Sequence, residues 1–533
     1  MSSTYHHKER ETWEEEHRHR VNTTSTRHTF PVADAENALT TSGPEYVHPA
    51  DTVRQRHSGP TTGPRRTEEG MQMTGPKHSC GVVGMNATYN VVPSLQRALL
   101  VIQHRGQESA GLSVFDGKNV QTVKNNGLVD AVLNENTLRT LSGNCGVGHV
   151  RYSTTGSHGA INAQPLTVQS AKGTVAIAHN GDITNYHILR SKYFEQGWSF
   201  LTDSDSEIIA RILSKYLYST DDYISAIRSM MSELDGAYAL AIMIGNRLFG
   251  VRDSQGLRPL CIGKTDGGQI IVSESAALIS LGAEFVRDVE PGEIVEIKDD
   301  IIISDKSKEP IHKAHCMFEW IYFARPDSVM DGRCVYDVRK NIGMILARES
   351  PADVDLVMPI PDSGRAHAIG YSLESGVPYE EGFMKNRFVG RTFILPDQSA
   401  RENAVAMKMN PIRSTIEGKR VLIVDDSIVR GTTLMKLINM LRGAGAKEVH
   451  VRIGCPPVIA PCYYGVDMKT RDQFIACTHT IEQIKESIGA DSLAYISIDG
   501  LVEALGIPKE DLCLACVNGI YPTRIEGEKY RYD

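Results

Sequence analysis

The sequence predicts an α+β domain with helices layered on sheets, followed by an α/β domain built on a parallel sheet. From Cys80 to about residue 306, short apolar runs such as "CGVVGM", "TVAIAHNG" and "AYALAIMI" are joined by glycine-bearing turns, and two stretches have helical periodicity, "VPSLQRALLVIQHRG" and "SEIIARILSKYL". This mixture is typical of a layered α+β domain. From about residue 335 apolar strands alternate with helices, as in "KRVLIVDDSIVRGTT" followed by "LMKLINMLRGAGA", which indicates a parallel sheet.

The bulk properties indicate a soluble enzyme-sized chain. Its 533 residues, 41% of them hydrophobic and 23% charged, allow two or three globular domains. A net charge of −8 gives no electrostatic basis for binding nucleic acid. We find no apolar run of membrane-spanning length and no signal-peptide pattern, and the ten cysteines suit a reducing compartment. We therefore expect a cytoplasmic protein that binds neither nucleic acid nor a membrane.

Residues 1–79 differ from the rest of the chain. "YHHKERETWEEEHRHR" is almost wholly charged and "SGPTTGPRRTEEG" is rich in turn-forming residues, so this segment has too little apolar surface to offset the entropy of ordering it. Its histidines lack a fixed metal-ligand spacing, which favours a solvated tail over a metal site. The predicted division of the chain is a disordered leader or propeptide at 1–79, two domains at 80–312 and 313–465, and a mostly helical C-terminal segment at 466–533.

The stretch "VLIVDDSIVRGTT", residues 421–433, carries the strongest signal. Asp425 and Asp426 follow a buried strand, at the end where α/β sheets place their ligands. The small, hydroxyl-rich loop after them opens a helix near Thr432, where backbone N–H groups and the helix dipole favour a phosphate. The two carboxylates suit ribose hydroxyls or Mg²⁺. An ordinary strand–turn–helix with an aspartate cap is the alternative for an isolated acidic pair.

The whole thirteen-residue pattern resembles the phosphoribosyl-pyrophosphate (PRPP) loop of type I phosphoribosyltransferases. "MPIPDSGRAHA" (358–368) resembles the pyrophosphate loop of that fold, and the basic stretch "KNRFVGRTFILPDQSAR" (385–401) resembles the flexible loop that closes over PRPP. The resemblance implies Mg²⁺ binding by Ser363 together with the two aspartates. It implies PRPP binding by Asp425, Asp426, Ser427, Arg430, Gly431, Thr432, Thr433, Lys385 and Arg387.

The first domain carries a second set of motifs. Cys80 is followed, in order, by "HRGQESAG", "GHVRYSTTG", "AHNGDITN" and "TDSDSE". Together they resemble the motifs of class II glutamine amidotransferases, which are N-terminal-nucleophile hydrolases with an αββα sandwich. The resemblance implies that Cys80 is the nucleophile and that Asn180 and Gly181 form the oxyanion hole. It assigns the glutamine α-carboxylate to Arg151 and the α-ammonium to Asp205.

A nucleophilic Cys80 explains why a leader must be removed. A thiol with a pKa of about 8.5 needs a base at neutral pH, and a free α-amine with a pKa of about 8 on the same residue can serve. The amide nitrogen that joins Cys80 to Ser79 cannot. Leaders in this family are short, so we expect that translation starts at Met71 or Met73, or that residues 1–70 are an extension without a catalytic role.

Taken together, residues 80–533 resemble the amidophosphoribosyltransferase family. The resemblance implies that glutamine is hydrolysed and that its ammonia is transferred to C1 of PRPP, giving 5-phosphoribosylamine, pyrophosphate and glutamate in the first step of purine (IMP) synthesis. It also implies a homotetramer and feedback inhibition by purine nucleotides. A sugar-phosphate aminating enzyme would lack the PRPP loop, and a PRPP-sensing regulator would carry degraded glutamine motifs.

The cysteines point to the iron–sulfur branch of that family. Cys513 and Cys516 form a C-x-x-C pair, which in an intracellular chain indicates metal ligation or redox chemistry. Spacing alone does not choose two further ligands, but the resemblance assigns Cys316 and Cys462, and thus a [4Fe–4S] cluster, with zinc as the alternative. The remaining five are expected to be buried small hydrophobic residues: Cys145, Cys261, Cys334, Cys455 and Cys477.

Overall fold

The computed structural model describes residues 80–152, 159–298, 301–306, 312–386, 408–468 and 470–525, all within one compact unit that spans residues 69–533. The predicted leader and most of the predicted flexible loop lie outside the described residues. Among the described residues, no helix is long and apolar enough to cross a membrane.

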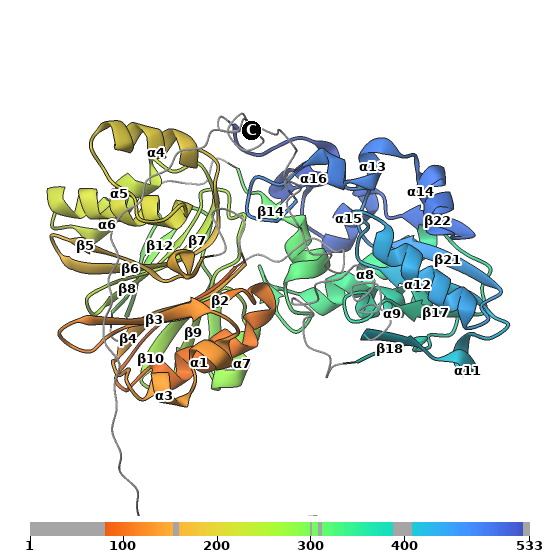
Figure 1. The fold of residues 1–533 in the computed structure, drawn as a ribbon, viewed down its shortest axis with the longest axis horizontal. Coiled ribbons are helices and arrows are strands. Elements are labelled where there is room, and N and C mark those ends of the chain that lie inside the picture. The colour runs from red at the N-terminus through yellow and green to blue at the C-terminus, as the bar shows by residue number, and fades with distance from the viewer. Residues whose placement is uncertain are drawn as a thin grey trace, which may run out of the picture. The chain divides into compact units, whose positions relative to one another are not determined.

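The first half contains two antiparallel sheets (Figure 1). The seven-stranded sheet has the order β11-β9-β10-β1-β4-β2-β3, with β1 Gly81–Ala87, β2 Ser109–Phe115, β3 Val120–Asn126, β4 Cys145–Arg151, β9 Cys261–Thr265, β10 Gly268–Val272 and β11 Glu284–Asp288. The six-stranded sheet has the order β13-β12-β8-β7-β6-β5, with β5 Leu166–Ser170, β6 Gly173–Ile183, β7 Gly236–Ile244, β8 Arg247–Arg252, β12 Ile294–Lys298 and β13 Ile301–Asp305.

Helices cover the outer faces of both sheets. They are α1 Val92–Val101, α2 Val129–Val132, α3 Glu135–Leu138, α4 Tyr186–Glu195, α5 Asp205–Ser219, α6 Tyr223–Met231 and α7 Ala276–Leu281, with short 3-10 turns η1 Gln103–Arg105 and η2 Ala160–Asn162. The two helical stretches predicted from periodicity are confirmed as α1 and α5.

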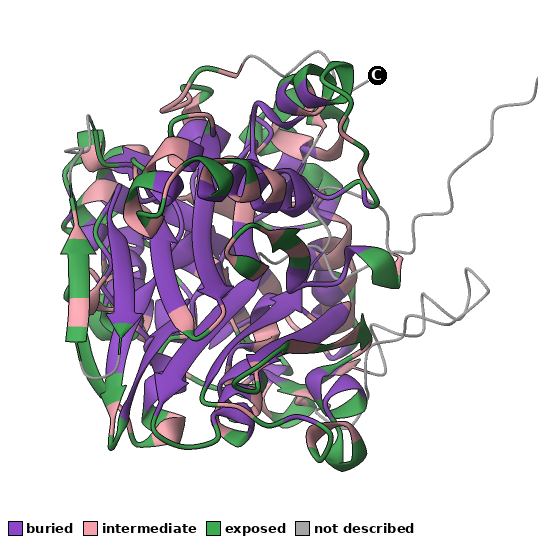
Figure 2. Cartoon of the chain, turned by 90° about the vertical axis from the view of Figure 1, so that its left-hand side faces the viewer, coloured by how far each residue is buried: buried purple, intermediate pink, exposed green. Residues whose placement is uncertain are grey.

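Alternation along the strands builds three apolar layers. On β1, Val82 belongs to the core between the two sheets, while its neighbour Val83 belongs to the core under α1 and α7. On β6, Ala178 faces the other sheet and Ile177 faces α5. Because successive side chains of a strand point to opposite faces, each strand fills two cores. The result is the expected αββα sandwich, and Figure 2 shows its strands buried over most of their length.

The second half is built on a parallel sheet with the order β17-β20-β21-β22. Its strands are β17 Leu356–Pro359, β20 Arg420–Asp425, β21 Glu448–Ile453 and β22 Ser492–Tyr495. The predicted buried strand before Asp425 is confirmed: residues 421–424 have no exposed surface. The strand β22 lies within the predicted C-terminal segment and extends this sheet.

Helices pack on this sheet over a single large core. They are α8 Val335–Glu349, α9 Arg365–Ser375, α11 Arg413–Ile416, α12 Thr432–Gly443, α13 Ile475–Thr478, α14 Ile481–Ile488, α15 Ile498–Leu505 and α16 Ala515–Asn518, with 3-10 turns η4 Arg471–Gln473 and η5 Lys509–Asp511. A π-helix, η3 Glu319–Phe323, precedes α8. Short strand pairs complete the fold: β14 His315–Cys316 with β23 Leu512–Cys513, β15 Val329–Met330 with β16 Arg333–Cys334, and β18 Phe383–Lys385 with β19 Met409–Pro411.

Candidate functional sites

The first candidate site begins at Cys80, which directly precedes β1. The register of β1 on β4 pairs Gly81 with Val150, so Arg151 at the end of β4 comes next to Cys80. The Cys80 thiol is buried and donates a hydrogen bond to the carbonyl oxygen of Tyr152 at 3.4 Å. Burial raises the pKa of the Cys80 thiol to about 11, although the Tyr152 hydrogen bond and the charge of Arg151 oppose the rise. The thiol therefore needs a base to react at neutral pH.

Asn180 and Gly181 lie near the end of β6. Asn180 has no exposed surface, and neither polar atom of its side-chain amide has a hydrogen-bond partner among the described residues. Gly181 has a φ of 149°, and a Cβ at this position would lie 1.9 Å from the carbonyl oxygen of Ala237 on the neighbouring strand β7. Only glycine fits there. A buried amide without a partner is costly, so it indicates a place where a substrate supplies the missing acceptor.

Asp205 is the first residue of α5 and is buried. Its carboxylate accepts a hydrogen bond from the backbone N–H of Ile183, at the end of β6, at 3.2 Å. The charge of Asp205 also acts on the Cys80 thiol and raises its pKa. The structure thus brings together Cys80, Arg151 and Asp205, as the sequence predicts, with one positive and one negative charge beside the thiol.

Arg105, in η1, is a site residue that sequence reasoning missed. Its buried guanidinium donates from Nε to the carbonyl oxygen of Cys80 at 3.0 Å, and it forms ion pairs with Glu274 and Glu319. The motif "HRGQESAG" contains it, but its partners lie 169 and 214 residues further along the chain. No local pattern in the sequence could have linked them.

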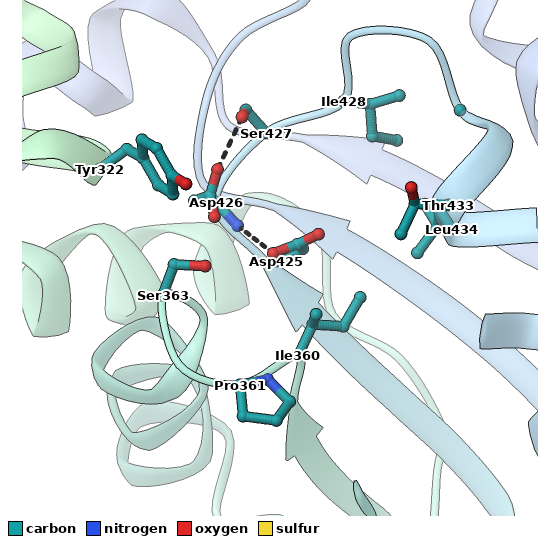
Figure 3. Close-up of a pocket in the computed structure, with 11 residues that line it drawn as sticks. Tyr322, Ile360, Pro361, Ser363, Asp425, Asp426, Ser427, Ile428, Thr433 and Leu434 are labelled. Carbon is teal, nitrogen blue, oxygen red and sulfur yellow. Dashed lines mark hydrogen bonds between the residues drawn. The ribbon is translucent and has the colours of Figure 1, made fainter. Parts of the chain in front are cut away.

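The second candidate site is a pocket of about 80 Å³ at the carboxyl ends of β17 and β20, which are adjacent parallel strands (Figure 3). Predicted residues that line it are Ser363, Asp425, Asp426, Ser427, Gly431 and Thr433. Gly431 has a φ of 75° and forms the N-cap of α12, which begins at Thr432 as the sequence predicts.

The two aspartates are held close together. The Asp426 side chain accepts a hydrogen bond from the Ser427 hydroxyl at 2.6 Å, and the backbone N–H of Asp426 donates to the Asp425 side chain at 2.9 Å (Figure 3). Burial and the adjacent carboxylate raise the pKa of Asp425, and burial raises the pKa of Asp426. Two such carboxylates in one pocket favour a bound cation or hydroxyl donors.

The other predicted PRPP ligands are placed in part. Lys385, in β18, forms an ion pair with Asp362 at 2.7 Å, in the loop that contains Ser363. Arg430 is half-buried in the loop before α12. Arg387 lies outside the described residues. Tyr322, in η3, also lines the pocket and was not predicted, because its motif "FEWIYFARPDS" is distant in sequence from the PRPP loop.

The predicted cluster ligands come from three segments. Cys316 and Cys513 are paired in register in the parallel strands β14 and β23. The carbonyl oxygen of Cys516 accepts hydrogen bonds from the backbone of residues 459 and 460, just before Cys462. The Cys462 sulfur accepts a hydrogen bond from the backbone N–H of Tyr464 at 3.4 Å. Within the described ranges, no three or more His, Cys, Asp or Glu side chains form a group suited to one metal ion.

The expectation for the other five cysteines was partly wrong. Cys145, Cys261 and Cys455 are buried as predicted. Cys334 is only half-buried and Cys477 is exposed. Both belong to short elements, β16 and α13, and the general tendency of free cysteines to be buried does not hold there.

Comparisons with known proteins agree with this two-site geometry. Residues 149–280 match the family model of a glutamine amidotransferase domain, and residues 346–456 match that of a phosphoribosyl transferase domain. The chain is 52% identical to the amidophosphoribosyltransferase of Methanocaldococcus jannaschii over 467 residues, which are 84% of this chain and 99% of that protein. It is 42% identical over 459 residues to the enzyme of the same name from Bacillus subtilis, covering 85% of this chain and 96% of that protein.

Solved structures give the same result. The glutamine PRPP amidotransferase of B. subtilis, complexed with ADP and GMP, superposes with a TM-score of 0.79 and 42% identity, over 84% of this chain and 98% of that one.

Proposed function

The chain belongs to the amidophosphoribosyltransferase family, and we propose that it divides the glutamine-dependent amination of PRPP between its two sites. The first hydrolyses glutamine and releases ammonia. The second transfers that ammonia to C1 of PRPP, giving 5-phosphoribosylamine and pyrophosphate, at the start of purine synthesis. The observation that carries the proposal is the presence, in one chain, of a buried Cys80 beside Arg151 and a paired-aspartate pocket at the N-terminus of α12.

In the glutamine half, the thiolate of Cys80 attacks the carboxamide carbon and forms a thioester. Asn180 and the backbone N–H of Gly181 stabilise the oxyanion, and the unpartnered amide of Asn180 supports this role. Arg151 binds the glutamine α-carboxylate and Asp205 its α-ammonium; the charges of both residues act on the Cys80 thiol, with opposite signs, which supports these two roles. Removing one oxyanion donor typically costs about 10²–10³ in kcat.

The base is the α-amine of Cys80 after removal of residues 1–79. A thiol with a pKa of about 11 is ionised in only about one molecule in 10⁴ at pH 7. An amine on the same residue takes the thiol proton and returns it to the departing ammonia. Water then hydrolyses the thioester to glutamate.

In the PRPP half, the loop from Ser427 to Thr433 holds the 5′-phosphate at the N-terminus of α12, with Arg430 nearby. Asp425 and Asp426 hold the ribose hydroxyls. Lys385 lies by the loop of Ser363, and Arg387 belongs to the stretch we propose closes over PRPP. Closure keeps water from C1, so ammonia attacks there as pyrophosphate departs.

The residues of this pocket also fit Mg²⁺. Its two carboxylates have raised pKa values, so a divalent cation would relieve a repulsion that the free site contains. Ser363 offers a hydroxyl ligand in the same pocket. Bound Mg²⁺ would neutralise the pyrophosphate leaving group.

We propose that the four predicted cysteines hold a [4Fe–4S] cluster, which their thiol chemistry suits. Cys316, Cys513 and Cys516 are buried, Cys462 is half-buried, and each acts electrostatically on at least one of the others. The hydrogen bond from Tyr464 to the Cys462 sulfur is of the kind that stabilises cluster thiolates. A bound cluster would join the three segments. Iron and sulfide analysis of the purified protein distinguishes it from zinc.

Further properties follow from the family. We propose that the protein is a cytoplasmic homotetramer and that purine nucleotides inhibit it. The ADP and GMP bound to the B. subtilis relative support the inhibition. Analytical ultracentrifugation and inhibition by AMP, ADP and GMP test these two points.

The test of the function is PRPP-dependent release of pyrophosphate, measured first with glutamine and then with ammonium chloride. Cys80→Ala should abolish the first activity and spare the second, and Asp425→Asn should abolish both. Cys477→Ala, at an exposed cysteine, is the matched control and should change neither. Loss of both activities in Cys80→Ala would contradict separate sites, and wild-type protein without either activity would overturn the proposal.

A further inference from the structure

The segment from Cys462 to Gly465 makes a backbone contact with β6, the strand that carries Asn180 and Gly181. Gly465 has a φ of 99°, and a Cβ on it would lie 2.9 Å from the carbonyl carbon of Gly181 and 3.0 Å from its oxygen. The backbone of Gly181 is therefore enclosed from two sides, because Ala237 touches it from β7 and Gly465 from the second half of the chain. Two glycines meet where neither tolerates a side chain.

Arg258 binds the same segment through hydrogen bonds to its backbone. Its guanidinium, fully buried, donates to the carbonyl oxygen of Tyr464 from Nε at 2.9 Å and also from Nη2. Its Nη1 donates to Glu319 at 3.1 Å. A Cβ on Gly465 would also lie 3.2 Å from Arg258 Nη2. The guanidinium of Arg258 thus binds the carbonyl group of the residue directly before Gly465.

Glu319 continues this connection to the nucleophile. It accepts from Arg105 Nη2 at 2.6 Å as well as from Arg258, and Arg105 in turn holds the carbonyl oxygen of Cys80 at 3.0 Å. All of these groups are buried, so the bonds form without competition from water. Tyr464 itself packs in an apolar cluster with Ala237, the residue that backs Gly181.

We infer that the segment Cys462–Gly465 is a positioning element of the glutamine site. Gly465 lies against Gly181, and Arg258 connects Tyr464 through Glu319 and Arg105 to the Cys80 backbone. None of these residues touches substrate. They act by holding the oxyanion donor and the nucleophile in register. The inference rests on the proposed function, because it names what aligns the proposed glutamine site. It extends that function by placing part of the alignment in a segment outside the glutamine amidotransferase match.

The first test compares Gly465→Ala with Gly173→Ala. Both glycines have a φ of 99°, but a Cβ on Gly173 meets nothing within 4 Å. The control therefore carries the same backbone strain without the contact. A displacement of about 1 Å at reacting groups costs on the order of 10²-fold in rate, so glutamine hydrolysis in Gly465→Ala should fall ten- to hundredfold in kcat. Ammonia-dependent pyrophosphate release should stay within twofold of wild type, and Gly173→Ala should keep both activities.

A labelling readout separates positioning from a general structural role. A diazoketone analogue of glutamine requires the oxyanion hole and the glutamine contacts to alkylate Cys80, whereas iodoacetamide requires only the thiolate. In Gly465→Ala, labelling of Cys80 by the diazoketone should slow at least tenfold, and labelling by iodoacetamide should be unchanged. Equal slowing with both reagents, or normal labelling with both, would overturn the inference.

Arg258 gives a second variant should Gly465→Ala fold poorly. Arg258→Lys keeps the charge but loses the fork that bridges Tyr464 and Glu319, so glutamine hydrolysis should fall at least tenfold with ammonia-dependent activity kept. Arg413→Lys, at an exposed arginine paired only with Glu417 among the described contacts, is the control. A parallel fall in both activities of Arg258→Lys would mean a structural role only. A wild-type protein without glutamine hydrolysis would instead refute the proposed function.

Discussion

Arg105 donates a hydrogen bond from Nε to the carbonyl oxygen of Cys80 at 3.0 Å, although both groups are buried and 25 residues apart in the chain. The Nη1 and Nη2 atoms of this guanidinium form ion pairs with Glu274, which precedes β14 in the sequence, and with Glu319, which follows it. The backbone of Cys80, the proposed nucleophile, is thus held by a buried ion-pair network that spans both halves of the described chain.

Arg105→Met should destabilise the protein, because the buried carboxylates of Glu274 and Glu319 lose a shared cation, although Glu319 keeps its ion pair with Arg258 and Glu274 its contact with His104. Breaking a buried pair in this way typically costs about 3–5 kcal/mol. Arg105→Lys keeps the charge but loses the hydrogen bond to Cys80, so it should retain most of the stability while glutamine hydrolysis falls at least tenfold. Denaturant unfolding and glutaminase kinetics measure the two effects. Arg139→Met, at an exposed arginine, is the control, and equal stability of the Met and Lys variants would contradict the argument.

Asn180→Leu should separate activity from stability. The amide of Asn180 is fully buried without a partner among the described residues, and such a group costs about 1–3 kcal/mol. Leucine of similar size removes that cost together with the oxyanion donor. We expect kcat for glutamine hydrolysis to fall about 10²–10³-fold, ammonia-dependent activity to persist, and the melting temperature to stay level or rise. Exposed Asn136→Leu is the control. A melting temperature lowered by several degrees would show that the amide has a structural partner.

The sequence allowed prediction of the residues that lie in contiguous motifs. Asp425, Asp426 and Gly431 follow one strand and precede one helix, so their common placement depends on local geometry that a strand–loop–helix pattern encodes. Arg105, Arg258, Glu319 and Gly465 could not be predicted as a set. Their contacts join residues up to 214 positions apart, and each type alone is compatible with an ordinary surface or turn. Cys477 shows the opposite error, because the general tendency of free cysteines to be buried predicted burial, whereas Cys477 is exposed.

The pH dependence of Cys80 alkylation should report the state of its amino group. Burial raises the pKa of the Cys80 thiol to about 11, so in chains that retain Ser79 the rate with iodoacetamide should rise about tenfold per pH unit from pH 7 to pH 10. Chains that begin at Cys80 should react measurably at pH 7, where the free amine accepts the proton. Mass spectrometry of the Cys80 peptide follows this residue separately from the exposed Cys477. Normal glutamine hydrolysis by chains that retain Ser79 would contradict the mechanism.

Asp425→Asn should stabilise the protein in the absence of Mg²⁺ and PRPP. Burial and the neighbouring Asp426 raise the pKa of Asp425 above its unfolded value of about 3.9. A carboxyl group of this kind contributes stability below about pH 4, and that stability is lost as the pH rises through the folded pKa. At pH 7.5, which lies above the unfolded value, the raised pKa of Asp425 therefore opposes folding, and the amide, which does not titrate, removes this cost. We expect a higher melting temperature for the variant at pH 7.5, a difference that shrinks toward acid, and no synthesis of 5-phosphoribosylamine. The control is Asp499→Asn, at an exposed residue paired with Lys509, which should change neither the melting temperature nor the synthesis of 5-phosphoribosylamine. A lower melting temperature of Asp425→Asn at pH 7.5 would mean that a partner stabilises the carboxylate of Asp425 in the free pocket.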